Sequence, residues 1–208
     1  KSVYNTGQFI LIFSTIALTA LLMIPVPSIA RLMKLDNHPE FVTWVIWIVA
    51  LDTLAVLPFS KLRFEGRPRK FAFIKILNIL INVGLVIFFL VLCKGQHEKN
   101  ADNIWSVIYN PRIDIGYVFL ANLVASALTL LFLSKELMSF RPKADLKLLR
   151  EMFIYTAPLI IVGFGGMINE TIDRFMIVQR FSGTVAEAKS ANGIYSANYK
   201  LALLIVLF

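Results

Sequence analysis

The sequence predicts an all-α protein that crosses a membrane several times, and three observations lead to this fold class. Of the 208 residues, 58% are hydrophobic and 16% are charged, whereas soluble domains average about 45–50% and about 25%. The hydrophobic residues form continuous runs, and about 20 such residues span the hydrocarbon core of a bilayer as a helix. The runs do not alternate between apolar and polar positions as barrel strands do, so helices are the expected spanning elements.

Six apolar segments follow one another along the chain, at about 7–29, 40–59, 70–93, 114–133, 151–180 and 191–208. The first four have the length of a membrane span, and the turn residues Asp36, Asn37 and Pro39 separate the first two. The fifth segment is longer and contains proline and glycine. The sixth is short because the sequence stops at Phe208, inside an apolar run, so we expect a piece of a longer protein.

The loops differ in charge, and this difference predicts how the chain is oriented in the membrane. The second-to-third and fourth-to-fifth loops together contain ten basic residues, whereas the other three loops share seven. Lys and Arg concentrate in cytoplasmic loops, so these two loops are expected in the cytoplasm. The net charge of +8 is interpreted in the same way and not as a sign of nucleic-acid binding.

The sequence contains no pattern typical of an enzyme or of a metal site. Cys93 is the only cysteine, and His38 and His97 are isolated. Neither a nucleotide-binding glycine loop nor a catalytic triad is found. We therefore predict no catalytic residue, no metal and no bound cofactor, and we leave coupling to H⁺ or Na⁺ open.

Polar residues inside the apolar segments are costly to bury and mark candidate sites. Asp52 lies near the middle of the second segment. In the third segment, Asn78 and Asn82 share a helix face with Lys75, which is close enough to the cytoplasmic end to extend toward the membrane surface. Hydrogen bonding to neighbouring helices is the structural alternative for the two asparagines, and ion pairing for Asp52.

The fifth and sixth segments contribute a larger polar set, namely Asn169, Glu170, Thr171, Asp173, Arg174, Ser196, Asn198, Tyr199 and Lys200. Glu170 and Arg174 are four residues apart and are expected to pair on one face. Polar stripes on four segments predict a shared, water-accessible cavity.

The fifth segment also contains four residues that weaken a helix, Pro158, Gly163, Gly165 and Gly166. Proline removes a backbone hydrogen bond, and glycine lowers the stiffness of a helix. This pattern predicts a hinge of the kind that transporters use, and close packing of a neighbouring helix against the glycines is the alternative.

Five stretches make a family resemblance visible: LDTLAVLPF at 51–59, RPRKFA at 67–72, KILNILINVGL at 75–85, NETIDR at 169–174 and GIYSANYK at 193–200. With these stretches the chain resembles the Wzx-like polysaccharide and O-antigen flippases, which belong to the multidrug/oligosaccharidyl-lipid/polysaccharide flippase superfamily. The resemblance covers nearly the whole sequence and is not specific to one glycan.

The resemblance implies a fold of about 12–14 helices in two lobes around a cavity that opens alternately to each side. The sequence would correspond to about the third to eighth helices. Residues 1–134 would belong to the first lobe, 135–150 would form a basic cytoplasmic linker with an amphipathic helix, and 151–208 would begin the second lobe.

The function implied by the resemblance is flipping of a polyprenyl-pyrophosphate-linked oligosaccharide across the bacterial inner membrane for lipopolysaccharide or other surface polysaccharides. Arg174 and Lys200 would neutralise the diphosphate, and Asn78, Asn82 and Tyr199 would bind sugar hydroxyls. Asp52, Glu170 and Asp173, beside Asn169, would carry a coupling ion or hold the cations. The expected partners are the lipid-linked oligosaccharide, membrane lipids and the polysaccharide polymerase machinery.

Three alternatives remain beside the flippase hypothesis. A cation-coupled multidrug antiporter of the same superfamily would require an acidic, apolar cavity, and Arg174 and Lys200 weigh against it. A membrane-embedded polysaccharide polymerase or ligase would place its catalytic residues in large outer loops. A scaffold without transport activity would not explain the carboxylates inside the membrane.

Overall fold

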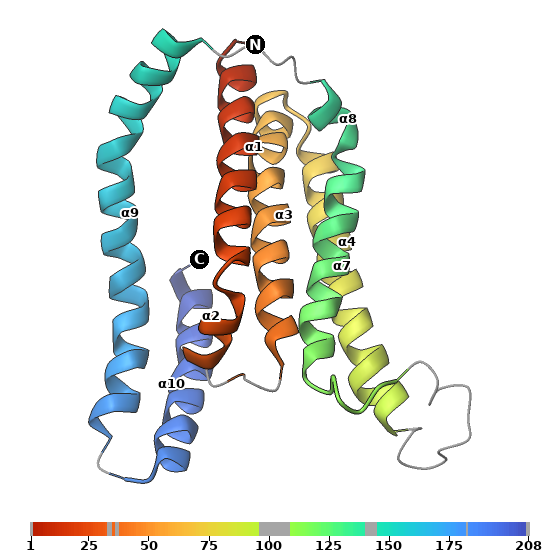
Figure 1. The fold of residues 1–208 in the computed structure, drawn as a ribbon, viewed down its shortest axis with the longest axis vertical. Coiled ribbons are helices and arrows are strands. Elements are labelled where there is room, and N and C mark those ends of the chain that lie inside the picture. The colour runs from red at the N-terminus through yellow and green to blue at the C-terminus, as the bar shows by residue number, and fades with distance from the viewer. Residues whose placement is uncertain are drawn as a thin grey trace. The chain divides into compact units, whose positions relative to one another are not determined.

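The computed structural model describes residues 2–32, 35, 38–95, 109–139, 145–181 and 183–206, and every regular element in these ranges is a helix (Figure 1). The all-α prediction is therefore confirmed. The chain divides into two compact units, residues 1–149 and 150–208. The first contains α1 (Ser2–Met23), α2 (Val26–Leu32), α3 (Pro39–Phe64), α4 (Pro68–Ile87), the π-helix η1 (Phe88–Cys93), α7 (Gly116–Phe132) and α8 (Ser134–Met138). The second consists of α10 (Val185–Val206) and most of α9 (Leu146–Arg180).

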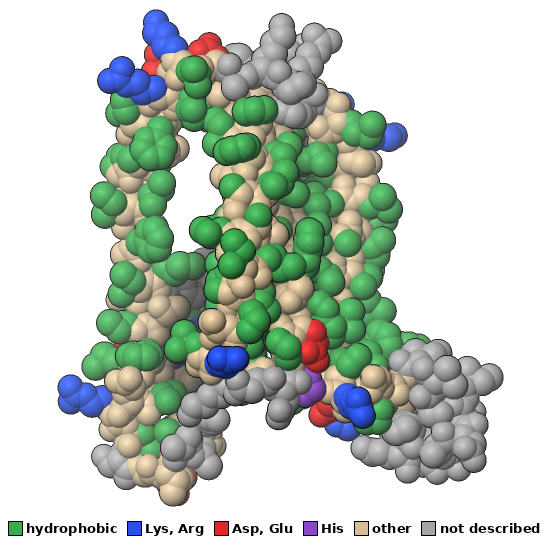
Figure 2. Space-filling model, in the orientation of Figure 1, with side chains coloured by type: hydrophobic (Ala, Val, Ile, Leu, Met, Phe, Trp, Pro, Cys, Tyr) green, Lys and Arg blue, Asp and Glu red, His purple; other side chains and the backbone are tan. Residues whose placement is uncertain are grey.

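Among the described residues, four helical stretches are long and apolar enough to cross a membrane: Val3–Met23, Pro39–Phe64, Pro68–Cys93 and Leu146–Arg180. They match the first, second, third and fifth predicted segments. Helix α7 is apolar but has 17 residues, and α10 is not among these four. Figure 2 shows hydrophobic side chains along the helices and Lys and Arg near their ends, as expected for spans with basic loops.

Prolines change the boundaries of the predicted segments in opposite ways. The segment predicted at 7–29 is two helices, because α1 ends at Met23 and α2 begins at Val26, next to Pro25 and Pro27. A proline lacks the N–H group and its ring clashes with the preceding turn. By contrast, α3 continues through the buried Pro58 as far as Phe64, beyond the predicted end at residue 59.

The turn between α3 and α4 depends on Gly66, which has a φ of +67°. The N–H of Arg67 donates to the Leu62 carbonyl over 3.0 Å, and the N–H of Gly66 donates to the Arg63 carbonyl over 3.2 Å. This pair of bonds is the Schellman arrangement, in which a glycine in the left-handed region ends a helix. The turn directs α4 back along α3 and fixes the end of α3 that carries Arg63.

Replacing Gly66 with alanine should lower the free energy of unfolding by about 1–2 kcal/mol, the cost of the left-handed conformation for a residue with a Cβ. The matched control is Gly84→Ala, because Gly84 lies inside α4 and a Cβ there meets nothing within 4 Å. That substitution should raise stability by about 0.5–1 kcal/mol. Thermal unfolding of the purified protein in detergent measures both changes, and a loss of stability at both positions would contradict this explanation.

The first unit packs around α3, α4 and α7, which contact one another. One core cluster consists of Ala55, Phe59, Leu62, Ile74 and Leu133. Ala121 and Ala125 of α7 are 1% and 0% exposed, in keeping with small residues that let neighbouring helices approach closely.

An ionic contact ties the end of the π-helix to the start of α7. The Lys94 ammonium lies 2.8 Å from the Asp114 carboxylate, and the Tyr109 hydroxyl donates to the same oxygen over 3.1 Å. The hydrogen bond from Lys94 is the largest cause that holds the pKa of Asp114 below its ordinary value, and the hydrogen bond from Tyr109 is the next largest. A lowered carboxyl pKa stabilises the fold above the ordinary carboxyl pKa, and this contribution is lost as the pH falls through the lowered value.

We therefore expect amide hydrogen exchange at residues 109–117 to accelerate in the wild-type protein as the pH falls below about 4, the ordinary carboxyl range, after correction for the intrinsic rate. Asp114→Asn should show the faster exchange already at neutral pH, with little further change in acid. Exchange in α9, measured in the same samples, serves as the reference. A variant that keeps the wild-type pH profile would contradict the role of Asp114.

Helix α9 bears on two sequence-based expectations. The expected amphipathic linker helix is not a separate element, because Leu146–Arg150 are the first turns of α9. Helix α9 is also continuous through Pro158, Gly163, Gly165 and Gly166, so the helix is not unwound there. The hinge role of these four residues and the division into lobes remain predictions.

Candidate functional site

A polar hollow of about 440 Å³ lies between α3, α4 and α7 in the first unit. We call it the polar pocket. It is lined by Asp52, Ala55, Val56, Phe59, Arg63, Phe71, Lys75, Asn78, Asn122, Ser126 and Thr129. These residues come from 52–63 of α3, 71–78 of α4 and 122–129 of α7. The pocket therefore extends from the middle of these helices toward the end that the loop charges predict to be cytoplasmic.

Hydrogen bonds between helices position the polar side chains of this region. The buried Ser126 hydroxyl donates to the Asp52 carboxylate over 2.7 Å, which joins α7 to α3. The Asn78 amide of α4 donates to the Thr129 hydroxyl over 2.9 Å, and that hydroxyl donates to the Ala125 carbonyl. Next to the pocket, the Asn82 amide lies 3.4 Å from the Asn122 side-chain oxygen. Three amides and two hydroxyls are therefore held in fixed positions.

Two cations of the polar pocket rest on a pair of aromatic rings. The Lys75 ammonium lies 4.6 Å from the centre of the Phe59 ring, and the Arg63 guanidinium carbon lies 5.4 Å from that of Phe71. The two rings meet edge to face, with centres 5.3 Å apart. Cation–π contacts of this kind hold a charged group in place without neutralising it.

The balance of charge in the polar pocket favours an anion. Among the residues that the structure describes, no carboxylate lies within ion-pair distance of Arg63 or Lys75. Asp52 is the one acidic residue that lines the pocket in this part of the chain, and it already accepts a hydrogen bond from Ser126. Arg63 and Lys75 are both exposed, so an anion can reach them without first breaking an ion pair.

The second unit has a polar cluster of its own, formed by Asp173 and Arg174 of α9 with Tyr195 and Tyr199 of α10. The Tyr195 hydroxyl donates to the Asp173 carboxylate over 2.9 Å, and the Arg174 guanidinium carbon lies 5.4 Å from the centre of the Tyr199 ring. The Arg174 Nε atom is buried without a hydrogen-bond partner among the described residues. In this cluster too, a cation lies against an aromatic ring.

The structure brings some of the sequence-predicted site residues together and leaves others apart. Asp52 and Asn78 line one pocket, and Asn82 is linked to it through Asn122. Lys75, expected to extend to the membrane surface, lines the same pocket. In the second unit Arg174 contacts Tyr199, whereas Asn169 and Lys200 are exposed. The expected Glu170–Arg174 pair involves the side chain of Glu170, which lies outside the described residues.

Sequence reasoning missed four side chains of the polar pocket, namely Arg63, Asn122, Ser126 and Thr129. The last three follow the spacing i, i+4 and i+7 in the fourth apolar segment, which places them on one helix face. This polar stripe can be recognised in the sequence and could have indicated the pocket. Arg63 was assigned to a loop because the second segment was expected to end at residue 59.

The sequence matches a known protein family along almost its whole length. Residues 5–208 match the family of proteins described as polysaccharide biosynthesis proteins. No curated protein and no solved structure matches the sequence. Because the family match covers both units and far more than half of the chain, it confirms the resemblance seen in the sequence. The chain belongs to the polysaccharide biosynthesis family, that of the Wzx-like polysaccharide flippases in the multidrug/oligosaccharidyl-lipid/polysaccharide superfamily.

Proposed function

We propose that this protein flips a polyprenyl-pyrophosphate-linked oligosaccharide from the inner to the outer leaflet of the bacterial inner membrane by alternating access. The observation that carries the proposal is the polar pocket, which presents two unneutralised cations and several amides and hydroxyls between apolar helices. A diphosphate-sugar headgroup cannot cross hydrocarbon unaided, because unpaired charges are very costly there. A pocket with this chemistry replaces the water that the headgroup loses.

The side chains of the polar pocket divide into roles by their chemistry. Arg63 and Lys75 bind the diphosphate, since hydrogen bonds from cations to phosphate oxygens are shorter and stronger than neutral ones. Asn78, Asn122 and Thr129 bind sugar hydroxyls, because amides and hydroxyls both donate and accept. Asp52 holds Ser126 in place, and it is also the group that would bind a coupling H⁺ or Na⁺.

The second unit supplies a further set of groups for the same substrate. Arg174 and Lys200 are the cations, and Asn169, Glu170, Asp173 and Tyr199 surround them in the sequence. We propose that this set takes over the diphosphate when the cavity opens to the other side. Bending of α9 at Pro158 and at Gly163, Gly165 and Gly166 would accompany that change.

Single substitutions in the second set should therefore strongly reduce export without preventing membrane insertion. Arg174→Ala and Lys200→Ala each remove one charge-assisted contact, worth about 1.5–3 kcal/mol, or about ten- to a hundredfold in rate. Export of surface polysaccharide by cells that express each variant, normalised to the amount of protein in the membrane, measures the effect. Full export by both variants would remove the second set from the mechanism.

The second candidate function is a cation-coupled multidrug antiporter of the same superfamily, and a polysaccharide polymerase or ligase is a more distant one. The cations Arg63 and Lys75 argue against the antiporter, because they repel a cationic drug. An enzyme would need a catalytic set, and membership of the polysaccharide biosynthesis family supports a flippase-type role. Contact with a polysaccharide polymerase, which would receive the flipped product, is part of the proposal.

Binding of the substrate is the direct test of this proposal. Native mass spectrometry of the full-length protein in detergent would compare a lipid-linked oligosaccharide, the same polyprenyl chain without diphosphate, and a cationic dye. We expect the first to bind most tightly and the dye not to bind. Preference for the dye would support the antiporter, and equal binding of the charged and uncharged lipids would contradict a role for the two cations.

A further inference from the structure

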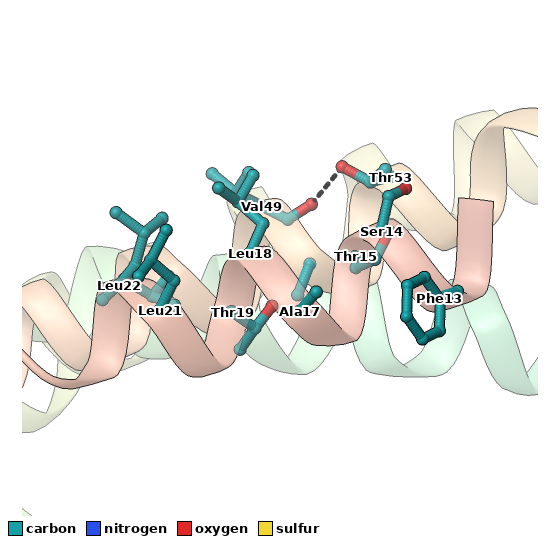
Figure 3. Close-up of a pocket in the computed structure, with 12 residues that line it drawn as sticks. Phe13, Ser14, Thr15, Ala17, Leu18, Thr19, Leu21, Leu22, Val49 and Thr53 are labelled. Atoms are coloured by element: carbon teal, nitrogen blue, oxygen red, sulfur yellow. Dashed lines mark hydrogen bonds between the residues drawn. The ribbon is translucent and has the colours of Figure 1, made fainter. Parts of the chain in front are cut away.

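A second hollow of about 560 Å³ lies between α1 and α3 of the first unit (Figure 3). We call it the apolar groove. Its walls include Phe13 and Leu18 of α1 and Val49 of α3, and these side chains are 68%, 53% and 53% exposed. Both helices are candidate membrane spans. The medium in front of the groove is therefore hydrocarbon and not water.

Four hydroxyl side chains line the groove, of which two bond to their own helices and the buried Thr15 hydroxyl has no hydrogen-bond partner among the described residues. The Thr53 hydroxyl donates to the Val49 carbonyl over 2.7 Å, the bond drawn in Figure 3, and the Ser14 hydroxyl donates to the Leu11 carbonyl over 3.1 Å. A hydroxyl that bonds to its own helix has used its proton. The groove suits a hydrocarbon chain better than a sugar or a phosphate.

The apolar groove and the polar pocket adjoin each other along α3. Val49 and Thr53 line the groove, whereas Asp52 and Val56 line the pocket. Spacings of three and four residues place Val49, then Asp52 and Thr53, then Val56 in one row along the helix. Val56, like Val49, is 53% exposed. A chain that leaves the pocket over Val56 reaches the groove past two polar side chains, Asp52 and Thr53, and the Thr53 hydroxyl already donates to the Val49 carbonyl.

The order of the two hollows along α3 matches the order of parts in a lipid. On α3 the pocket extends from Asp52, near the middle of the helix, to Arg63, near the end predicted to be cytoplasmic, whereas the groove extends from Thr53 to Ile46, away from that end. A lipid of the inner leaflet has its headgroup at the cytoplasmic surface and its chain toward the centre. We propose that the apolar groove holds the first isoprene units of the substrate whose diphosphate occupies the polar pocket, an inference that rests on the proposed function.

A pair of tryptophan substitutions on α1 tests this inference. Ala17 is exposed and lines the groove, and Ala20 is exposed on the same helix but does not line it. The probe is a long-chain polyprenyl diphosphate with a diazirine on its second isoprene unit, added to the full-length protein in phospholipid vesicles. We expect labelling of residues 13–22 and 46–53 in the wild type. Ala17→Trp should reduce labelling about tenfold, which equals the loss of roughly two buried methylene groups, and Ala20→Trp should change it less than twofold.

A short-chain probe separates the groove from the pocket. A diphosphate-sugar with two isoprene units should bind Ala17→Trp as tightly as wild type, and it should bind the Arg63→Ala/Lys75→Ala variant weakly. The inference is overturned if the long-chain probe does not label the groove, if both tryptophan variants lose labelling equally, or if a diazirine phospholipid labels the groove as strongly. Groove labelling in a protein that does not flip lipid would overturn the proposed function alone, and flipping without groove labelling would overturn the groove alone.

Discussion

Replacing Arg63 and Lys75 together with alanine should reduce flipping of a polyprenyl-pyrophosphate-linked oligosaccharide at least about a hundredfold, because each charge-assisted contact to phosphate is worth about 1.5–3 kcal/mol. The variant should still fold. Among the described residues neither cation forms an ion pair, so their removal leaves no carboxylate buried alone. Flipping is measured in proteoliposomes with a fluorescent lipid-linked oligosaccharide.

The control removes the same charge from the same end of the first unit. Arg67, whose side chain is 61% exposed, pairs with Glu65 at 3.6 Å, and Arg69 is exposed; neither lines the polar pocket. Arg67→Ala/Arg69→Ala should retain flipping within about threefold of wild type, because neither side chain is among those that line the pocket. A similar loss in both double variants would mean that basic charge at the membrane surface, and not the pocket, supports activity.

Replacing Lys70 with alanine should cost about 3 kcal/mol of unfolding free energy, the largest stability effect that we expect. The Lys70 ammonium lies 2.6 Å from the Glu136 carboxylate, and the Glu136 side chain is 5% exposed. Removing the cation leaves a buried carboxylate without compensation. Glu136→Ala should cost only about 1 kcal/mol, because Lys70, whose side chain is 36% exposed, regains water.

The combination of both substitutions distinguishes a buried ion pair from simple loss of packing. Lys70→Ala/Glu136→Ala should be more stable than Lys70→Ala alone, because the unpaired carboxylate is gone. Lys135→Ala, in an exposed position of the same short helix α8, should leave the melting temperature unchanged. Purely additive losses in the double variant would contradict the coupling of the two charges.

The order of the long helices could be predicted from the sequence, because a continuous apolar run of span length satisfies its backbone hydrogen bonds in a membrane by forming a helix. Helix boundaries could not, and the prolines show why. Pro25 and Pro27 are separated by one residue, and α1 ends before them. Pro58 lies inside α3, and the nearby residues Ala55 and Phe59 of the same helix are buried in the core. Tertiary packing therefore outweighs the lost hydrogen bond.

Part of the candidate site could also be predicted from the sequence. Asp52, Asn78 and Asn82 stood out because polar groups inside apolar runs are costly. Arg63 did not, since its place in the pocket depends on α3 continuing past Pro58 and on the glycine turn that follows. Which faces of α3, α4 and α7 meet is set by packing at residues such as Ala121 and Ala125, and no single segment encodes that contact.

Transport by the full-length protein in proteoliposomes tests the central claim most directly. The measurement follows a polyprenyl-pyrophosphate-linked oligosaccharide from one leaflet to the other, with and without a gradient of H⁺ or Na⁺. We predict flipping that requires the protein and that is lost in the Arg63→Ala/Lys75→Ala variant. Gradient-driven uptake of a cationic dye without any flipping of the oligosaccharide would contradict the flippase proposal and favour the antiporter.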